Sequence, residues 1–103
     1  MGVLMNEDRF YAVSVLIDVA SVAANTSAEQ DFTVPGLVVG DIVTVVKPSL
    51  SAGLVIGNVR VKAANTLSIT FGNLTASPIN PAAETYLLKV FHPEKTYTNN
   101  VPL

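Results

Sequence analysis

Short runs of alternating apolar and polar residues, each closed by a turn, constrain the fold of this chain more than any other feature. In the clearest run, residues 66–71, three large apolar residues (Leu67, Ile69 and Phe71) alternate with Thr and Ser. A period of two is the side-chain period of a β-strand that turns one face to a core. This run therefore predicts a half-buried strand.

Similar runs recur along the chain and are separated by Gly, Pro and Asn residues that favour turns. The predicted strands cover residues 10–24, 29–34, 42–47, 54–63, 66–71 and 84–91. Gly57, inside the fourth run, predicts a β-bulge or a close approach of backbone. The sequence Ala-Ala-Asn-Thr occurs at residues 23–26 and 63–66, which indicates either an internal repeat or two similar hairpin turns, and we predict the turns. No segment between the runs is both long and periodic enough for a crossover helix, so we expect an all-β, jelly-roll-like antiparallel β-sandwich.

Residues 10–24 are the one place where a helix competes with a strand. Val13, Leu16, Ile17 and Ala20 stand at helical spacing. Counted at a period of two, however, four β-branched residues align on one face, and such residues lose rotamer freedom in a helix. We therefore predict a strand. The four aligned residues are Val13, Val15, Ile17 and Val19.

With 103 residues, the chain is long enough for one domain with its own core. Residues 1–11 and 93–103 have no clear period, so we expect extended N- and C-terminal arms around a sandwich over residues 12–92. Only 14% of the residues are charged, against about 25% in a typical soluble domain. So few charges cannot cover a whole exterior, and we expect part of the surface to be buried against other chains.

Charge and terminal sequence weigh against nucleic-acid and membrane partners. The net charge is −2 and the six Lys and Arg residues are scattered, which gives no basic patch for phosphates. Residues 1–9 carry acids where an export signal would carry bases. The apolar stretch over residues 10–24 contains Asp18 and is too short to span a bilayer. We expect no nucleic-acid partner and no membrane partner.

The sequence offers little material for catalysis or for a cofactor. It contains no Cys and one His, His92, which we interpret as a surface residue at the end of a strand. Two carboxylate pairs, Glu29 with Asp31 and Asp18 with Asp41, are candidates for acid–base work. Glu29 and Asp31 stand beside a turn, the usual place for solvated acids, whereas Asp18 sits among apolar residues and is expected to face a partner or a loop amide. We therefore expect no enzyme activity, no catalytic residue, no metal and no cofactor.

A set of turn motifs, in a fixed order, covers residues 22–91. It opens with VAANTSAEQDFTVPGL, from Val22 to Leu37. It continues with Val39-Gly40-Asp41, Lys47-Pro48-Ser49, Gly53-Leu54, Arg60-Val61, Ala63-Ala64-Asn65-Thr66-Leu67, Ile69-Thr70-Phe71, Pro78 and Glu84-Thr85-Tyr86. This pattern resembles that of structural proteins of tailed bacteriophages, and at this length it resembles a capsid cement (decoration) protein.

The resemblance implies a small β-sandwich, made in the cytoplasm of a host bacterium, that sits on the outside of a capsid in the virion. It implies that the major capsid protein and a second or third copy of the chain are the partners. The alternative is a head- or tail-fibre module that binds a host receptor or glycan through residues 48–53 and 72–81. The candidate partner contacts are Met1, Val3, Leu4, Phe10, Tyr11, Tyr97, Val101 and Leu103.

Overall fold

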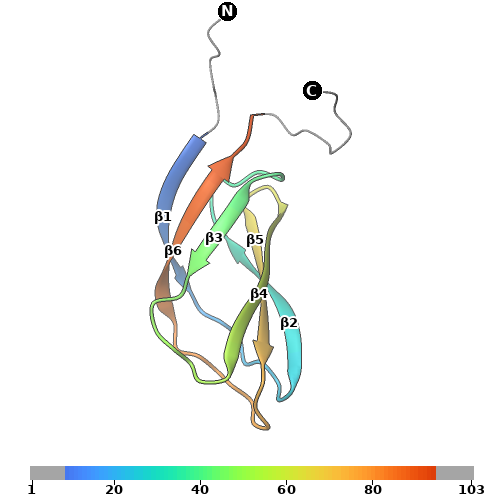
Figure 1. Cartoon of the computed structure of the whole chain (residues 1–103). Coiled ribbons are helices and arrows are strands. Elements are labelled where there is room, and N and C mark those ends of the chain that lie inside the picture. The colour runs from blue at the N-terminus through green and yellow to red at the C-terminus, as the bar shows by residue number, and fades with distance from the viewer. Residues whose placement is uncertain (1–8, 95–103) are drawn as a thin grey trace, which may run out of the picture.

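The structure is a computed structural model, and it describes residues 9–94, which form six strands. The strands are β1 (Arg9–Ile17), β2 (Thr26–Thr33), β3 (Ile42–Val46), β4 (Leu54–Ala63), β5 (Thr66–Asn73) and β6 (Glu84–His92) (Figure 1). The all-β class predicted from the alternating runs is therefore confirmed.

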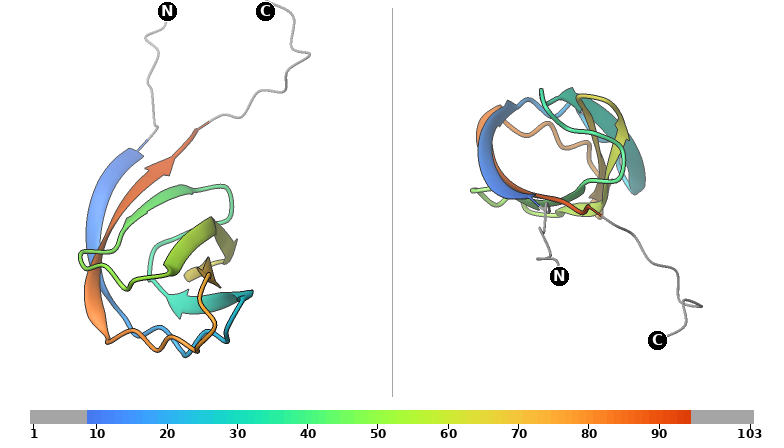
Figure 2. Two further views of the ribbon diagram at one scale, coloured as in Figure 1. Left: turned by 60° about the horizontal axis from the view of Figure 1, so that its bottom comes forward. Right: turned by 90° about the horizontal axis from the view of Figure 1, so that it is seen from above.

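The strands make two antiparallel sheets of three, in the orders β1-β6-β3 and β2-β5-β4. Every connection except the β4–β5 hairpin leads from one sheet to the other. Figure 2 shows the two sheets curving around a common interior. The antiparallel sandwich is thus confirmed for the described residues.

The central strand of each sheet supplies three of the thirteen buried apolar residues of the core, more than any other strand, because it has a neighbour on both sides. From β5, Leu67, Ile69 and Phe71 are fully buried, and from β6, Leu88 and Val90 are fully buried. Phe32 of β2 meets Phe71 edge-on, with ring centroids 6.3 Å apart, a geometry favoured by aromatic pairs. In residues 66–71, the period-two pattern therefore identified both the strand and its inward face.

The first strand is shorter at its end, and longer at its start, than we predicted. It stops at Ile17, because its partner β6 begins at Glu84, which lies opposite Ile17. The following residues cross to the other sheet, where Val22 exchanges backbone hydrogen bonds of 2.8 and 3.0 Å with Ile79. At its start, the strand includes residues 9–11, which we placed in the N-terminal arm; they pair with β6.

Left-handed backbone at Asn25 (φ 53°) and Asn65 (φ 63°) confirms that the two Ala-Ala-Asn-Thr segments form similar turns. Only the second closes a hairpin, between β4 and β5; the first leads into β2 from the other sheet. The predicted bulge is confirmed as well. Between Ile56 and Val59, β4 has one residue more than the facing part of β5, and Gly57 lies in this segment.

Candidate functional site

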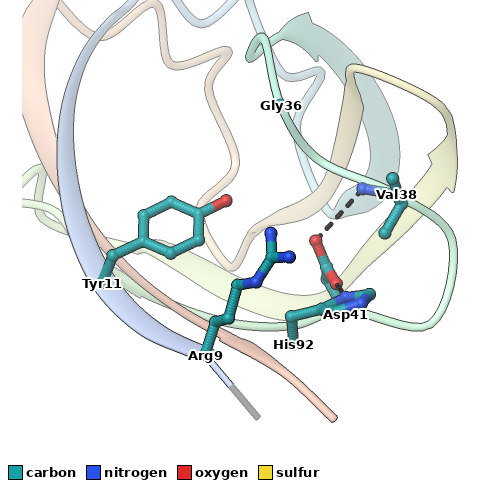
Figure 3. A pocket seen from close by; sticks show the side chains of 6 residues that line it. All are labelled: Arg9, Tyr11, Gly36, Val38, Asp41 and His92. Atoms are coloured by element: carbon teal, nitrogen blue, oxygen red, sulfur yellow. Dashed lines mark hydrogen bonds and ion pairs between the residues drawn. The ribbon is translucent and has the colours of Figure 1, made fainter. Parts of the chain in front are cut away.

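One end of the sandwich carries a small cleft of about 130 Å³ (Figure 3). Arg9 and Tyr11 enter it from β1 and His92 from β6, while the rest of its lining comes from the loop between β2 and β3. In Figure 3, the Arg9 guanidinium and the Tyr11 hydroxyl point into the same space. The cleft thus joins the start of one edge strand to the end of the central strand.

Asp41 is the buried polar group of this cleft, with a side chain only 2% exposed. One carboxylate oxygen contacts Nδ1 of His92, and the other accepts the backbone N–H of Val38 at 3.1 Å. His92 ends a strand, as we expected, but it has a side-chain partner that we did not predict. Local sequence carries no signal for this pair, because 51 residues separate its members.

The polar contacts of the cleft hold two parts of the fold together. Asp41 fastens the loop before β3 to the end of β6, and this satisfies a buried carboxylate that would otherwise be costly. Among the described residues lining the cleft there is no Ser, Thr or Cys that the His–Asp pair could activate as a nucleophile. Within residues 9–94, no group of three or more His, Cys, Asp or Glu side chains could hold a metal ion.

The two candidate carboxylate pairs do not come together as acid–base pairs. Asp41 is engaged by His92, while Asp18 is exposed on the connection after β1. Glu29 and Asp31 lie on the outer face of the β2-β5-β4 sheet and each bonds a cation of β4. Each of these two acids is therefore neutralised by a base.

These pairs form a polar ladder, defined as Glu29–Arg60 and Asp31–Lys62 with Ser68 between them. Arg60 donates two hydrogen bonds to Glu29, at 2.7 and 2.8 Å, and Lys62 donates one to Asp31 at 2.9 Å. Ser68 donates to Asp31 at 2.7 Å. The hydrogen bonds from Arg60 lower the pKa of Glu29, and those from Ser68 and then Lys62 lower the pKa of Asp31.

The outer face of the other sheet is mainly apolar, and its residues line up in cross-strand rows. Phe10, Phe91 and Ile42 form one row, and Ser14, Leu87 and Val46 form another. Between them lies a row of Ala12, Lys89 and Thr44, and Leu16 extends the face along β1. We call these residues the apolar face.

Aromatic contacts fix one end of the apolar face. Phe10 stacks on Phe91, with ring centroids 4.5 Å apart and planes inclined by 19°. The Lys89 ammonium lies 5.9 Å from the centroid of the Phe10 ring, within the range of a cation–π contact. Even so, Phe10 is 65% exposed and Leu16 69% exposed. Exposed apolar side chains gathered on one face are typical of contact surfaces, so we take the apolar face as the candidate binding site.

Of the candidate partner contacts, two lie in the described part of the chain. Phe10 belongs to the apolar face, whereas Tyr11 points to the other side of β1 and lines the cleft. The others lie outside the described residues; they are Met1, Val3, Leu4, Tyr97, Val101 and Leu103. Sequence reasoning missed Ile42, Val46 and Leu87, which stand exposed on the outer side of their strands.

The two loops of the alternative hypothesis meet at the opposite end of the sandwich from the cleft (Figure 1). The backbone N–H of Leu74 donates to the carbonyl of Gly53 at 2.9 Å. Leu50 in one loop is 88% exposed and Leu74 in the other is 72% exposed. Beside them lies a shallow depression lined by residues of β2, β4 and β5 and of the turns next to them.

Among residues 9–94, no helix is long and apolar enough to cross a membrane. Comparisons with protein-family models, with curated proteins and with solved structures found no match to this chain.

Proposed function

We propose that this chain is a capsid cement protein, which binds the outside of a bacteriophage capsid and holds neighbouring major capsid subunits together. The observation that carries the proposal is the apolar face of the β1-β6-β3 sheet. The phage-like turn motifs over residues 22–91 supply the identity of the partner.

The contrast between the two outer faces supports a fixed orientation on a partner. One face carries four charged residues in two ion pairs, whereas Lys89 is the single charged residue of the other face, among mainly apolar side chains. Solvated ion pairs resist burial because their desolvation is costly. In the proposed complex, the apolar face therefore meets the capsid and the polar ladder faces water.

The size of the apolar face indicates that one contact is weak. The nine-residue strands β1 and β6 are about 27 Å long and the five-residue β3 is about 14 Å long, so at a spacing of about 4.8 Å they span a projected area of roughly 330 Å². Burying that area contributes on the order of 10 kcal/mol, which is similar to the roughly 4–15 kcal/mol lost as rigid-body freedom. A cement protein can work with such contacts, because the same contact repeats at every equivalent position of a symmetric shell.

The test is binding to capsids that lack the chain. We expect the purified full-length protein to co-sediment with them at a copy number that matches the lattice, and to raise the temperature at which they release DNA. A charge in the apolar face, Leu87→Lys, should reduce binding at least tenfold. Ser27→Lys, which places the same charge on the outer face of β2, is the matched control and should bind normally.

Two results would contradict the proposal. One is a natural copy number of only a few chains per particle. The other is equal binding by the Leu87→Lys and Ser27→Lys proteins.

The alternative, a fibre module that binds a host receptor or glycan, is favoured by the exposure of Leu50 and Leu74 at one end of the sandwich. It predicts that Leu50→Ser and Leu74→Ser abolish binding to host cells and leave binding to capsids unchanged.

A further inference from the structure

Three of the four edge strands in this sandwich carry features that prevent pairing with another strand. The edge strand β4 has two bulges, and both Arg60 and Lys62 stand on it. β3 has only five residues and packs beside β4. On β2, Glu29 and Asp31 are charged, and the Gln30 side chain binds the backbone of Ala20 at 2.8 and 2.9 Å. Charges, bulges, short strands and covering loops are the usual protections of a sheet edge.

The fourth edge, β1, has none of these features. Its nine residues pair with β6 in an unbroken register, from Arg9 opposite His92 to Ile17 opposite Glu84. The sequence of the strand, RFYAVSVLI, contains neither Gly nor Pro, and its one charge is at its first residue. A long, regular and uncharged edge presents unpaired N–H and C=O groups to any strand that approaches it.

Burial along the inner side of β1 leads to the same conclusion. Tyr11 is exposed and Val13 and Val15 are half-buried, although all three point to the interior side of the sheet. On the neighbouring β6, Leu88 and Val90 are fully buried. The difference arises because β6 has a strand on each side, whereas β1 has one on a single side. A strand added beside β1 would complete the burial of these residues.

We propose that β1 pairs with β1 of a second copy of this chain, antiparallel and about a two-fold axis through Val13. This register uses the whole strand and places Phe10 opposite Leu16 of the second copy and Ala12 opposite its Ser14. It brings no like charges together. Arg9, the only charged residue of the strand, lies opposite the apolar Ile17 of the second copy. The self-complementarity of the strand is the reason for choosing a second copy as the occupant.

The resulting dimer contains one continuous six-stranded sheet, and main-chain hydrogen bonds join its halves. The apolar faces of the two copies lie on the same side of this sheet, because a two-fold axis perpendicular to a sheet preserves its faces. The pairing is thus an interaction site in its own right, and it does not depend on the identity of the partner that the apolar face meets.

Charge exchange at Ser14 tests the pairing with the full-length protein. Ser14 is exposed on the outer side of β1 and lies diagonal to Ser14 of the second copy. Like charges at neighbouring cross-strand positions are unfavourable, so Ser14→Lys and Ser14→Glu should each raise the dimer dissociation constant about fivefold. Analytical ultracentrifugation measures this constant. Circular dichroism checks that each variant is folded.

Mixing the two variants gives the decisive measurement. One of the two variants is labelled with ¹⁵N so that native mass spectrometry can tell the chains apart. Heterodimers of the Ser14→Lys and Ser14→Glu chains should then make up well over half of all dimers, whereas random pairing of equal amounts would give one half. Thr44→Lys, on β3 at the far edge of the same face, is the matched control and should dimerise as the wild type does. A wild type that is monomeric at about 1 mM would overturn the proposal, as would random pairing of the mixture or loss of the dimer in Thr44→Lys.

Discussion

Tyr86 has the largest fully buried side chain in the described part of the chain, and its hydroxyl has no hydrogen-bond partner there. A buried hydroxyl without a partner costs about 1–3 kcal/mol of desolvation. At the residue scale, we therefore predict that Tyr86→Phe raises the free energy of unfolding, by about 1 kcal/mol. Urea denaturation at pH 7 measures this free energy of unfolding. Tyr11→Phe, which removes a hydroxyl at the open cleft, is the control and should change stability by less than about 0.5 kcal/mol.

The same hydroxyl predicts the alkaline limit of stability. Burial, and secondarily the charge of Glu84, raises the pKa of Tyr86 from 10.0 to about 12. Between these values the unfolded chain releases the phenolic proton and the folded chain keeps it, so stability falls as pH rises through this range. In the Tyr86→Phe protein, the free energy of unfolding should fall less steeply with pH over the same interval. An unchanged slope would show that the hydroxyl reaches water in the folded protein.

Asn73 is the buried polar residue that organises the loop after β5. Its amide donates to the carbonyls of Val22 at 3.0 Å and Ser77 at 2.8 Å, and its oxygen accepts the N–H of Thr75 at 2.8 Å. We predict that Asn73→Ala lowers the free energy of unfolding by about 2–4 kcal/mol, because it leaves these groups unpaired. Chemical denaturation measures the loss. Asn58→Ala, at an exposed position on β4, should have little effect, and equal losses in the two variants would contradict the prediction.

At the scale of elements, the polar ladder couples the two edge strands of one sheet across β5. Because the pKa values of Glu29 and Asp31 are lowered in the folded state, their stabilisation is complete above their ordinary values of 4.5 and 3.8. It is lost as pH falls through the lowered values, where the folded carboxylates take up protons. We predict that Arg60→Gln lessens the fall in stability between pH 7 and pH 3, since Glu29 then titrates nearer its ordinary pKa.

Acid unfolding followed by circular dichroism measures this effect. The reversed pair, Glu29→Arg with Arg60→Glu, restores the ion pair across the same two strands and should recover most of the wild-type pH dependence. Lys89→Gln, outside the ladder, is the control for the loss of one positive charge. If Arg60→Gln and Lys89→Gln have the same acid profile, the ladder does not contribute to the pH dependence.

Strands were predictable from the sequence wherever alternation and turn chemistry agreed. The strand predicted over residues 54–63 has the same bounds as β4, and Gly57 predicted the bulge in it. The prediction overran after Ile17, because Val19 and Val22 continue an apolar pattern while they cross to the other sheet. An apolar pattern indicates only that side chains are buried. A segment that crosses from one sheet to the other can be buried without pairing with a strand. The length of a strand depends on its neighbour, which local sequence does not contain.

At the scale of the whole molecule, charge composition predicted an exposed apolar surface but could not place it. The apolar face needs the cross-strand register, which brings Phe10, Phe91 and Ile42 into one row although they are far apart in the sequence. The Asp41–His92 contact is of the same kind. Long-range pairing thus decides which of the outward-facing residues share a surface, and this is the part of the site that the sequence could not supply.

Both sheets contribute to one hydrophobic core, so the described domain should unfold in a single step. Ile69, on the central strand of one sheet, is fully buried in that core. We predict that Ile69→Ala lowers the free energy of unfolding by about 2–5 kcal/mol through the cavity it leaves. Hydrogen exchange should then report equal losses of protection at Leu67 of β5 and Leu88 of β6, although these strands belong to different sheets. Val55→Ala, at an exposed site on β4, is the control. A loss of protection confined to β5 would mean that each sheet unfolds by itself, and that the core does not couple the apolar face to the polar ladder.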